Sequence, residues 1–222
     1  MDPLLLRGLF GPGQKPYVVG ITTATSTGTP ITMTYPDRGR GVLTVAIIAR
    51  HVGGTAAPGL PTGWSTLTNA TVAPAYRLAY KYTDGSEGLT FTSSATSATS
   101  MSAIVYAFKG SSTSNVVVSP AQGGAATATS ATPDPGGFAQ NTIDGQVYWL
   151  PYCIWNGAGT VVSYPTGFCK DTATVVQSTN GGIAACGRLF PTESAFSENI
   201  GAFTISASLV NRAGSISVPQ WV

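Results

Sequence analysis

Residues 42–49 have the sequence VLTVAIIA, a nearly continuous apolar run that is rich in β-branched side chains. Such a run is typical of a β-strand that is covered on both faces. Residues 103–108 (AIVYAF) have the same character, whereas residues 89–92 (LTFT) and 203–206 (FTIS) alternate between apolar and polar side chains. Because alternation indicates a strand with one face in water, we expect strands of both kinds.

Turn-forming pairs separate these expected strands. Asp-Gly or Gly-Gly pairs occur at residues 53–54, 84–85, 144–145 and 181–182. Glycine, proline or clusters of Ser and Thr interrupt every segment that would otherwise sustain a helical period. Short strands separated by turns predict an all-β sandwich or barrel, and 222 residues are enough to bury its core.

The apolar run belongs to a pattern that occurs twice. Residues 41–43 (GVL) open a strand that leads to residues 61–64 (PTGW), and residues 145–147 (GQV) open another that leads to residues 165–168 (PTGF). Both pairs of segments are separated by 104 positions. This spacing predicts that the chain consists of two related halves.

A half of this length holds about four or five strands, and a sheet of that size leaves one apolar face uncovered. We therefore predict a single jelly-roll-like antiparallel β-sandwich over residues 17–222, built from the two halves packed face to face. The halves would span residues 17–110 and 141–222, with the Ser-, Ala-, Gly- and Pro-rich residues 111–140 as the crossover. Two separately folded domains are the alternative.

Residues 1–16 do not fit the strand pattern, because glycine and proline interrupt a set of apolar side chains. We expect an extended N-terminal arm that docks onto its own sandwich, a sister subunit or a different protein, with a contact outside its own fold favoured. The partner-binding residues predicted in this arm are Leu4, Leu5, Leu6, Leu9 and Phe10.

The composition narrows the classes of partner. Charged residues make up only 9% of the chain, against about a quarter in a typical protein. The hydrophobic share of 43% is that of a folded chain. A formal net charge of +2 gives no basic field, so we expect neither nucleic acid nor a membrane as the partner. The first residues lack the pattern of a signal peptide, which predicts synthesis in a cytoplasm.

Side chains for catalysis are scarce. His51 is the single histidine, no serine motif of a nucleophile accompanies it, and we interpret it as a loop or strand-end residue. Asp84 and Glu87 flank one turn, where they could share a calcium ion with main-chain carbonyls, but the loop has no established calcium motif. We therefore predict a protein that is not an enzyme and that has no catalytic residue, cofactor or metal site.

The three cysteines, Cys153, Cys169 and Cys186, all lie in the last third of the chain. Their odd number and the absence of a C-x-x-C spacing do not fit a disulfide scaffold or a zinc site. We interpret them as buried thiols that act as small apolar side chains.

Two groups of residues are candidates for surface contacts. Arg38, Arg40 and Arg50 would form a small cationic contact patch or, alternatively, charges that flank an apolar strand and oppose aggregation. Trp155 precedes a glycine-rich segment, so we expect it at a loop tip, where it would face a glycan. Trp64 stands at the start of a strand and is expected in the core.

The segments of the first half follow a distinctive order. A Gly-initiated apolar strand at residues 41–49 precedes Pro-Thr-Gly-Trp at residues 61–64 and an aromatic strand at residues 76–82. The turn TDGSE at residues 83–87 and a strand that ends in YAFKG at residues 106–110 follow. This combination resembles a recurring module of tailed-bacteriophage virion proteins.

The resemblance covers residues 40–222, and the second half departs from it. Phe168 stands in place of the tryptophan, and residues 189–193 (LFPTE) stand in place of the Asp-Gly-Ser-Glu turn. The resemblance implies a β-sandwich on a virion surface, made in the cytoplasm of the bacterial host. We expect a capsid decoration or cement protein that binds the major capsid protein, or another virion protein, through its arm and stabilises the phage head.

A homo-oligomer would fit this role, and a trimer would suit the local threefold sites of a capsid. The alternative is a tail or fibre module that binds a receptor or a glycan, which predicts an exposed aromatic shelf at Trp155 or Tyr164. An enzyme that acts on polysaccharide would instead need two carboxylates facing each other in a groove.

Overall fold

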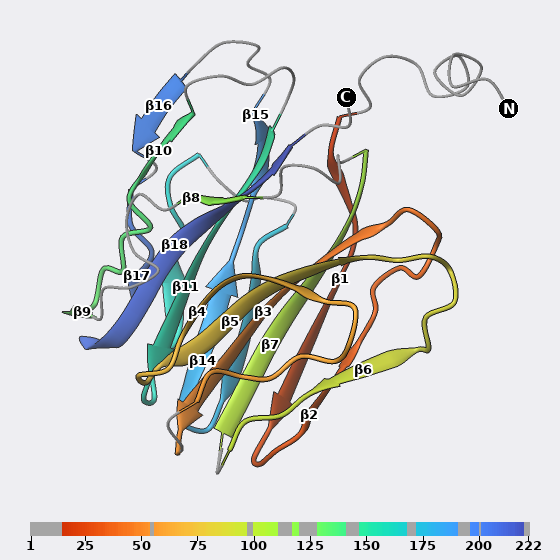
Figure 1. The fold of residues 1–222 in the computed structure, drawn as a ribbon. Coiled ribbons are helices and arrows are strands. Elements are labelled where there is room, and N and C mark those ends of the chain that lie inside the picture. The colour runs from red at the N-terminus through yellow and green to blue at the C-terminus, as the bar shows by residue number, and fades with distance from the viewer. Residues whose placement is uncertain are drawn as a thin grey trace, which may run out of the picture.

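The computed structural model describes residues 15–53, 56–96, 100–110, 117–119, 128–140, 147–167, 172–190, 196–199 and 201–219. These residues form two large antiparallel sheets and three two-stranded ribbons, with no helix among them (Figure 1). The predicted all-β, antiparallel fold is therefore confirmed.

The first sheet takes all its strands from the first half of the chain. Its centre is β3 (Leu43–Val52), which pairs with β5 on one side and β7 on the other. The order of the sheet is β1 (Tyr17–Ser26), β7 (Ser100–Lys109), β3, β5 (Ala75–Tyr82) and β4 (Ser65–Ala70).

The second sheet is centred on β11 (Val147–Asn156), which lies between β14 and β18. Its order is β13 (Thr174–Ser178), β14 (Gly181–Ala185), β11, β18 (Leu209–Pro219) and β8 (Val117–Ser119). Two more strands join it, because β15 (Arg188–Phe190) pairs with β11 and β9 (Ala128–Ser130) pairs with β18. Segment 111–140, expected to be a crossover, thus contributes β8 and β9 to this sheet.

The strand orders of the two sheets are equivalent. β7, β3, β5 and β4 follow one another in the first sheet, as β18, β11, β14 and β13 do in the second. β3 and β11 also begin at the last residues of the repeated segments 41–43 and 145–147, which lie 104 positions apart. This equivalence supports the relation between the halves, which stays a prediction. Jelly-roll connectivity is not confirmed, because the described strands of each sheet come from one part of the chain.

A single apolar core, the central core, lies between the two sheets. It contains alternate side chains of β3, among them Leu43, Val45 and Ile47, together with Leu150 and Ile154 of β11. The rings of Tyr76 and Tyr152, one from each sheet, are 6.3 Å apart. Side chains of both sheets therefore share one core, whereas the two-domain alternative predicts two separate cores; the division of the chain into halves stays a prediction.

Each sheet is also covered on its outer face by a ribbon. The ribbon of β2 (Ile31–Thr34) and β6 (Thr90–Ser93) packs Met33 and Phe91 against Ile48 of β3. The ribbon of β12 (Val161–Ser163) and β17 (Thr204–Ile205) packs Ile205, together with the adjacent Phe203, on the second sheet. The third ribbon consists of β10 (Gly137–Gln140) and β16 (Phe196–Asn199).

The two kinds of strand are confirmed by this arrangement. Every residue of β3 except the last is buried, as expected for a strand covered on both faces. β6 alternates, with Phe91 buried and its neighbours Thr90 and Thr92 exposed. The β2–β6 ribbon thus presents one apolar face to the first sheet and one hydroxyl-rich face to water.

The shared central core predicts that the sandwich unfolds as one unit. Ile47→Ala in the first sheet and Ile154→Ala in the second should each lower the free energy of unfolding by about 2–5 kcal/mol, because each leaves a cavity in the same core. Denaturant titration and calorimetry should show one transition that both variants shift. Two transitions, each sensitive to only one variant, would contradict a common core.

Candidate functional site

The loop between β5 and β6 is held together by its own carboxylates. Glu87 accepts hydrogen bonds from the backbone N–H groups of Asp84 and Gly85, both at 3.0 Å. Asp84 Oδ1 accepts from the backbone N–H of Ser86 at 2.8 Å. The Ser86 hydroxyl and N–H lower the pKa of Asp84 below its usual value. The two residues considered as calcium ligands therefore organise this loop.

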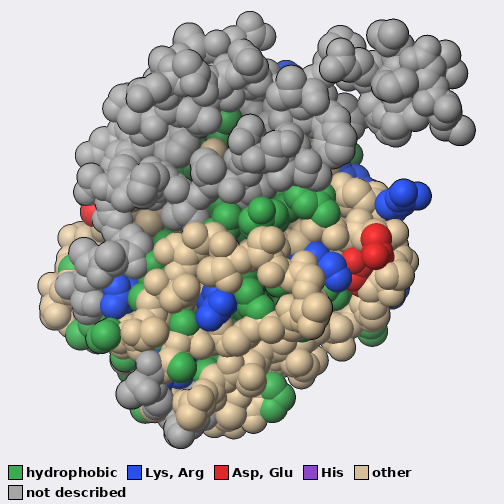
Figure 2. Space-filling view, viewed as in Figure 1, with side chains coloured by type: hydrophobic (Ala, Val, Ile, Leu, Met, Phe, Trp, Pro, Cys, Tyr) green, Lys and Arg blue, Asp and Glu red, His purple; other side chains and the backbone are tan. Residues whose placement is uncertain are grey.

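Charged side chains gather around the loop and pair with one another. Lys81 Nζ lies 3.3 Å from Glu87 Oε1, and the Glu87 side chain is only 2% exposed. Burial alone would raise the pKa of Glu87, but the loop N–H groups and Lys81 together lower it. Lys109 Nζ lies 3.0 Å from Asp37 Oδ2. Figure 2 shows acidic and basic side chains next to one another at one edge of this face of the molecule.

Three aromatic rings lie next to this charged cluster. Tyr35 follows β2, Trp64 precedes β4 and Phe91 belongs to β6. The Phe91 ring centroid is 4.6 Å from those of both Tyr35 and Trp64. Trp64, expected in the core, is only partly buried.

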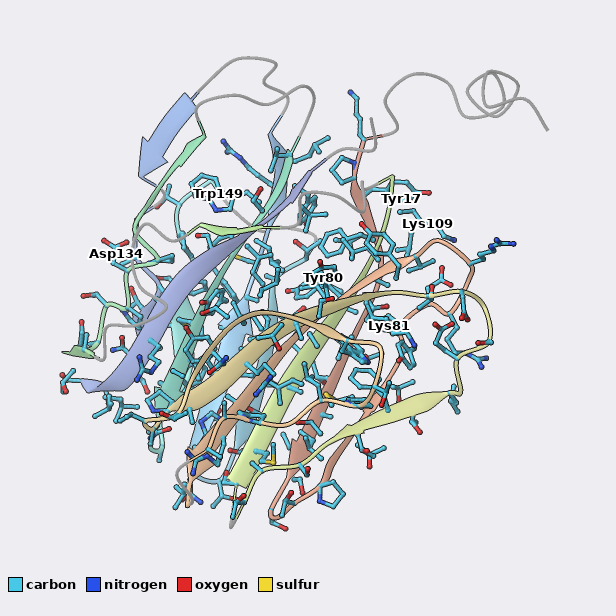
Figure 3. The ribbon with its side chains drawn as sticks, in the orientation of Figure 1. Tyr17, Tyr80, Lys81, Lys109, Asp134 and Trp149 are labelled. Carbon is cyan, nitrogen blue, oxygen red and sulfur yellow. The ribbon has the colours of Figure 1, made fainter. Side chains whose placement is uncertain are left out.

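An open pocket of about 320 Å³ connects the rings with the ion pair. Its lining consists of Tyr35, Pro61, Thr62, Trp64, Lys81, Glu87, Gly88, Thr90, Phe91 and Thr92. Figure 3 shows Lys81 beside the β5–β6 loop. The sequence did not predict this pocket, because its residues come from four separate segments. The one feature of the sequence that pointed to this place is the Pro-Thr-Gly-Trp motif, which contributes part of the lining.

The predicted cationic patch is wrong, because Arg38, Arg40 and Arg50 do not share one exposed surface. Arg38 and Arg40 are exposed, and Arg38 Nη1 donates to the backbone carbonyl of Glu87 at 3.3 Å. Arg50 is only 1% exposed and donates to the carbonyl of Thr71 at 2.8 Å. The physical reason is the length of β3, because an extended strand advances about 3.3 Å per residue and Arg50 lies near its far end.

The prediction that Trp155 faces a glycan is also wrong. Trp155 is 0% exposed, packs among the side chains that cover the second sheet, and donates from Nε1 to the carbonyl of Gly159 at 3.0 Å. The glycine-rich segment after β11 folds back over the indole instead of exposing it. Tyr164, the other residue of the expected shelf, is partly buried against Phe203, with ring centroids 5.8 Å apart.

His51 lies in the interface between the two sheets, near the end of β3. It is 1% exposed, and its Nε2 is 2.6 Å from the hydroxyl of Ser102, which is also buried. A Cβ atom at Gly181 of β14 would collide with the imidazole, so glycine is required there. Burial lowers the pKa of His51 to about 4. The imidazole is therefore neutral at pH 7, and the His–Ser pair is enclosed rather than open to a substrate.

The cysteines differ from one another. Cys153 is a buried free thiol, as predicted, and burial raises its pKa. Cys186 is disulfide-bonded, which corrects the prediction of a thiol at this position. Cys169 lies outside the described residues. An odd number of cysteines requires one unpaired residue within the chain but does not require three.

The predicted arm residues Leu4, Leu5, Leu6, Leu9 and Phe10 also lie outside the described residues. Among the described residues, no group of three or more His, Cys, Asp or Glu side chains is placed so that it could hold a metal ion. The described part of the chain contains no helix of the length and hydropathy needed to cross a membrane. No protein-family model, curated protein or solved structure matches this chain.

The buried imidazole predicts a loss of stability in acid. In the unfolded chain the pKa of His51 returns to about 6.5, so between pH 6.5 and 4 the unfolded state binds a proton that the folded state excludes. The free energy of unfolding should fall by on the order of 3 kcal/mol across this window, and this contribution should level off below pH 4.

Urea titrations at a series of pH values should measure this fall. The matched control is His51→Gln, which does not titrate and retains a polar group for Ser102. The difference between the two proteins isolates His51 from the carboxylates, which also titrate in acid. Equal pH dependence in both proteins would contradict the prediction.

Proposed function

We propose that this chain is a non-enzymatic virion structural protein, a decoration or cement protein that binds and stabilises the head of a tailed bacteriophage. The resemblance over residues 40–222 first suggests this role, and the all-β sandwich agrees with it. The partner would be the major capsid protein or another virion protein, bound by a homo-oligomer such as a trimer.

The observation that carries the proposal is that the sandwich covers its own apolar surfaces. Both faces of each large sheet are packed, one in the central core and one under a ribbon. Among the residues that the structure describes, the large apolar side chains that stay exposed belong to different strands and loops: Tyr17, Val52, Val72, Leu89, Val162 and Val175. A sandwich that covers its own apolar faces needs a further element to attach it to the phage head. The apolar residues of the N-terminal arm would supply this element.

The chemistry of the surface also supports a passive role. The acidic groups of the charged cluster are engaged, Glu87 and Asp84 by loop amides and Asp37 by Lys109. On the face that Figure 2 shows, much of the described surface is backbone and side chains that are neither charged nor hydrophobic. Contacts between neutral groups depend little on ionic strength, which suits a protein that must remain on a particle outside the cell.

A tail or fibre module that binds a glycan is the second candidate. The aromatic shelf expected at Trp155 is buried, but the pocket beside Trp64 offers another aromatic surface with polar neighbours. This observation favours glycan recognition without depending on where in the virion the protein is located.

Removal of residues 2–16 tests the attachment role. The truncated protein should keep the unfolding temperature of the full chain, because the described sandwich begins with β1 at Tyr17. It should no longer co-sediment with phage particles that lack the protein, whereas the full chain should saturate them. Quantitative gel analysis of the pelleted particles measures the occupancy.

A second variant keeps the length of the arm and replaces its five apolar side chains by serine: Leu4, Leu5, Leu6, Leu9 and Phe10. It should bind as poorly as the truncated protein, while the control Gln14→Ala should bind normally. Full occupancy by both arm variants would overturn the anchoring role.

A further inference from the structure

The open pocket at the outer face of the first sheet combines aromatic side chains with a fixed pair of charges. Trp64 and Phe91 line one part, and Lys81 and Glu87 line another. Its volume of about 320 Å³ falls in the lower range of small-molecule sites. An aromatic ring packs well against the C–H face of a sugar, while an ammonium group forms strong hydrogen bonds to hydroxyl groups.

The polar side of the pocket is preorganised. Glu87 is fixed by two backbone N–H groups and by Lys81, so neither charge must be ordered when a ligand binds. Gly63 in the Pro-Thr-Gly-Trp turn has φ +87°, and a Cβ atom there would lie 3.7 Å from Lys81 Cε. The turn that positions Trp64 thus packs against Lys81, and the aromatic and charged parts of the pocket are held together.

We propose that this pocket binds a neutral pyranose ring, as a single residue or as the end of a longer glycan. The sugar stacks on the aromatic surface of Trp64, and its hydroxyl groups bond to Lys81 and to the exposed hydroxyl groups of Thr62, Thr90 and Thr92. An uncharged sugar is favoured because the positive charge of Lys81 is already balanced by Glu87. The site is separate from the N-terminal arm, so glycan binding and particle attachment can fail independently.

The ligand can be sought with a panel of neutral methyl pyranosides: the glucoside, galactoside, mannoside and N-acetylglucosaminide. Saturation-transfer NMR on the full chain should detect at least one of them at millimolar concentration, and chemical-shift changes should include the backbone signals of Gly88, Thr90 and Thr92. A signal from glucuronate with none from the neutral sugars would overturn the proposal.

Two variants test the location. Lys81→Met removes one partner of the hydroxyl groups and should weaken binding about tenfold or more. Because it also leaves Glu87 without its cation, Gly88→Leu provides an independent test that keeps the ion pair. A Cβ atom at Gly88 meets nothing closer than 3.8 Å, so the added side chain narrows the pocket wall without straining the fold.

The matched control is Thr32→Val, which lies opposite Thr92 on the same ribbon but does not line the pocket. It should bind like the unmodified chain. Unchanged affinity in both pocket variants, or loss of binding in the control as well, would overturn the assignment. Each variant is also tested for attachment to particles, which the proposal expects to be unaffected.

Discussion

The structure depends on one constraint: the central strand of each sheet is apolar on both faces, so each sheet needs cover on both sides. β3 and β11 can satisfy only one face by packing their sheets against each other. The other face requires a further layer, which the chain supplies as a two-stranded ribbon on each sheet. Hydrophobic burial thereby sets a four-layer order, with the ribbons outside and the two sheets between them.

The parts of the fold that follow from local pattern were predictable from the sequence. The continuous apolar run at residues 42–49 forms the buried strand β3, and the alternating residues 89–92 overlap β6, which has one face exposed to water. One error concerns Cys186, which is disulfide-bonded rather than a thiol. The others concern Trp155 and Arg50, whose surroundings depend on how a following segment folds back. Residue type and neighbours along the chain do not determine this. The pocket was missed for the same reason, since only the packed ribbon brings Phe91 to Trp64.

The repeated Pro-Thr-Gly turns show how far the two halves agree in detail. Gly63 and Gly167 have nearly the same left-handed conformation, with φ +87° and +80°. A cationic side chain lies beside each turn: Lys81 near Gly63, and Arg188, which donates to the Gly167 carbonyl at 3.1 Å. Because a positive φ favours glycine, this residue is constrained in both turns. The two sequences differ at the next residue, which is Trp64 in the first half and Phe168 in the second.

A body that covers its own apolar faces separates stability from recognition. The central core and the two outer layers hold the sandwich together, and the ion pairs Lys81–Glu87 and Lys109–Asp37 lie near the loop between β5 and β6. In both proposals recognition falls to parts that the core does not constrain, namely the loops around the β2–β6 ribbon and the N-terminal arm. Substitutions at such places alter few core contacts, so contact surfaces can change while the sandwich stays the same. The pocket beside Trp64 occupies this position, because its rings rest on the outer layer while Lys81 and Glu87 belong to the end of β5 and its loop.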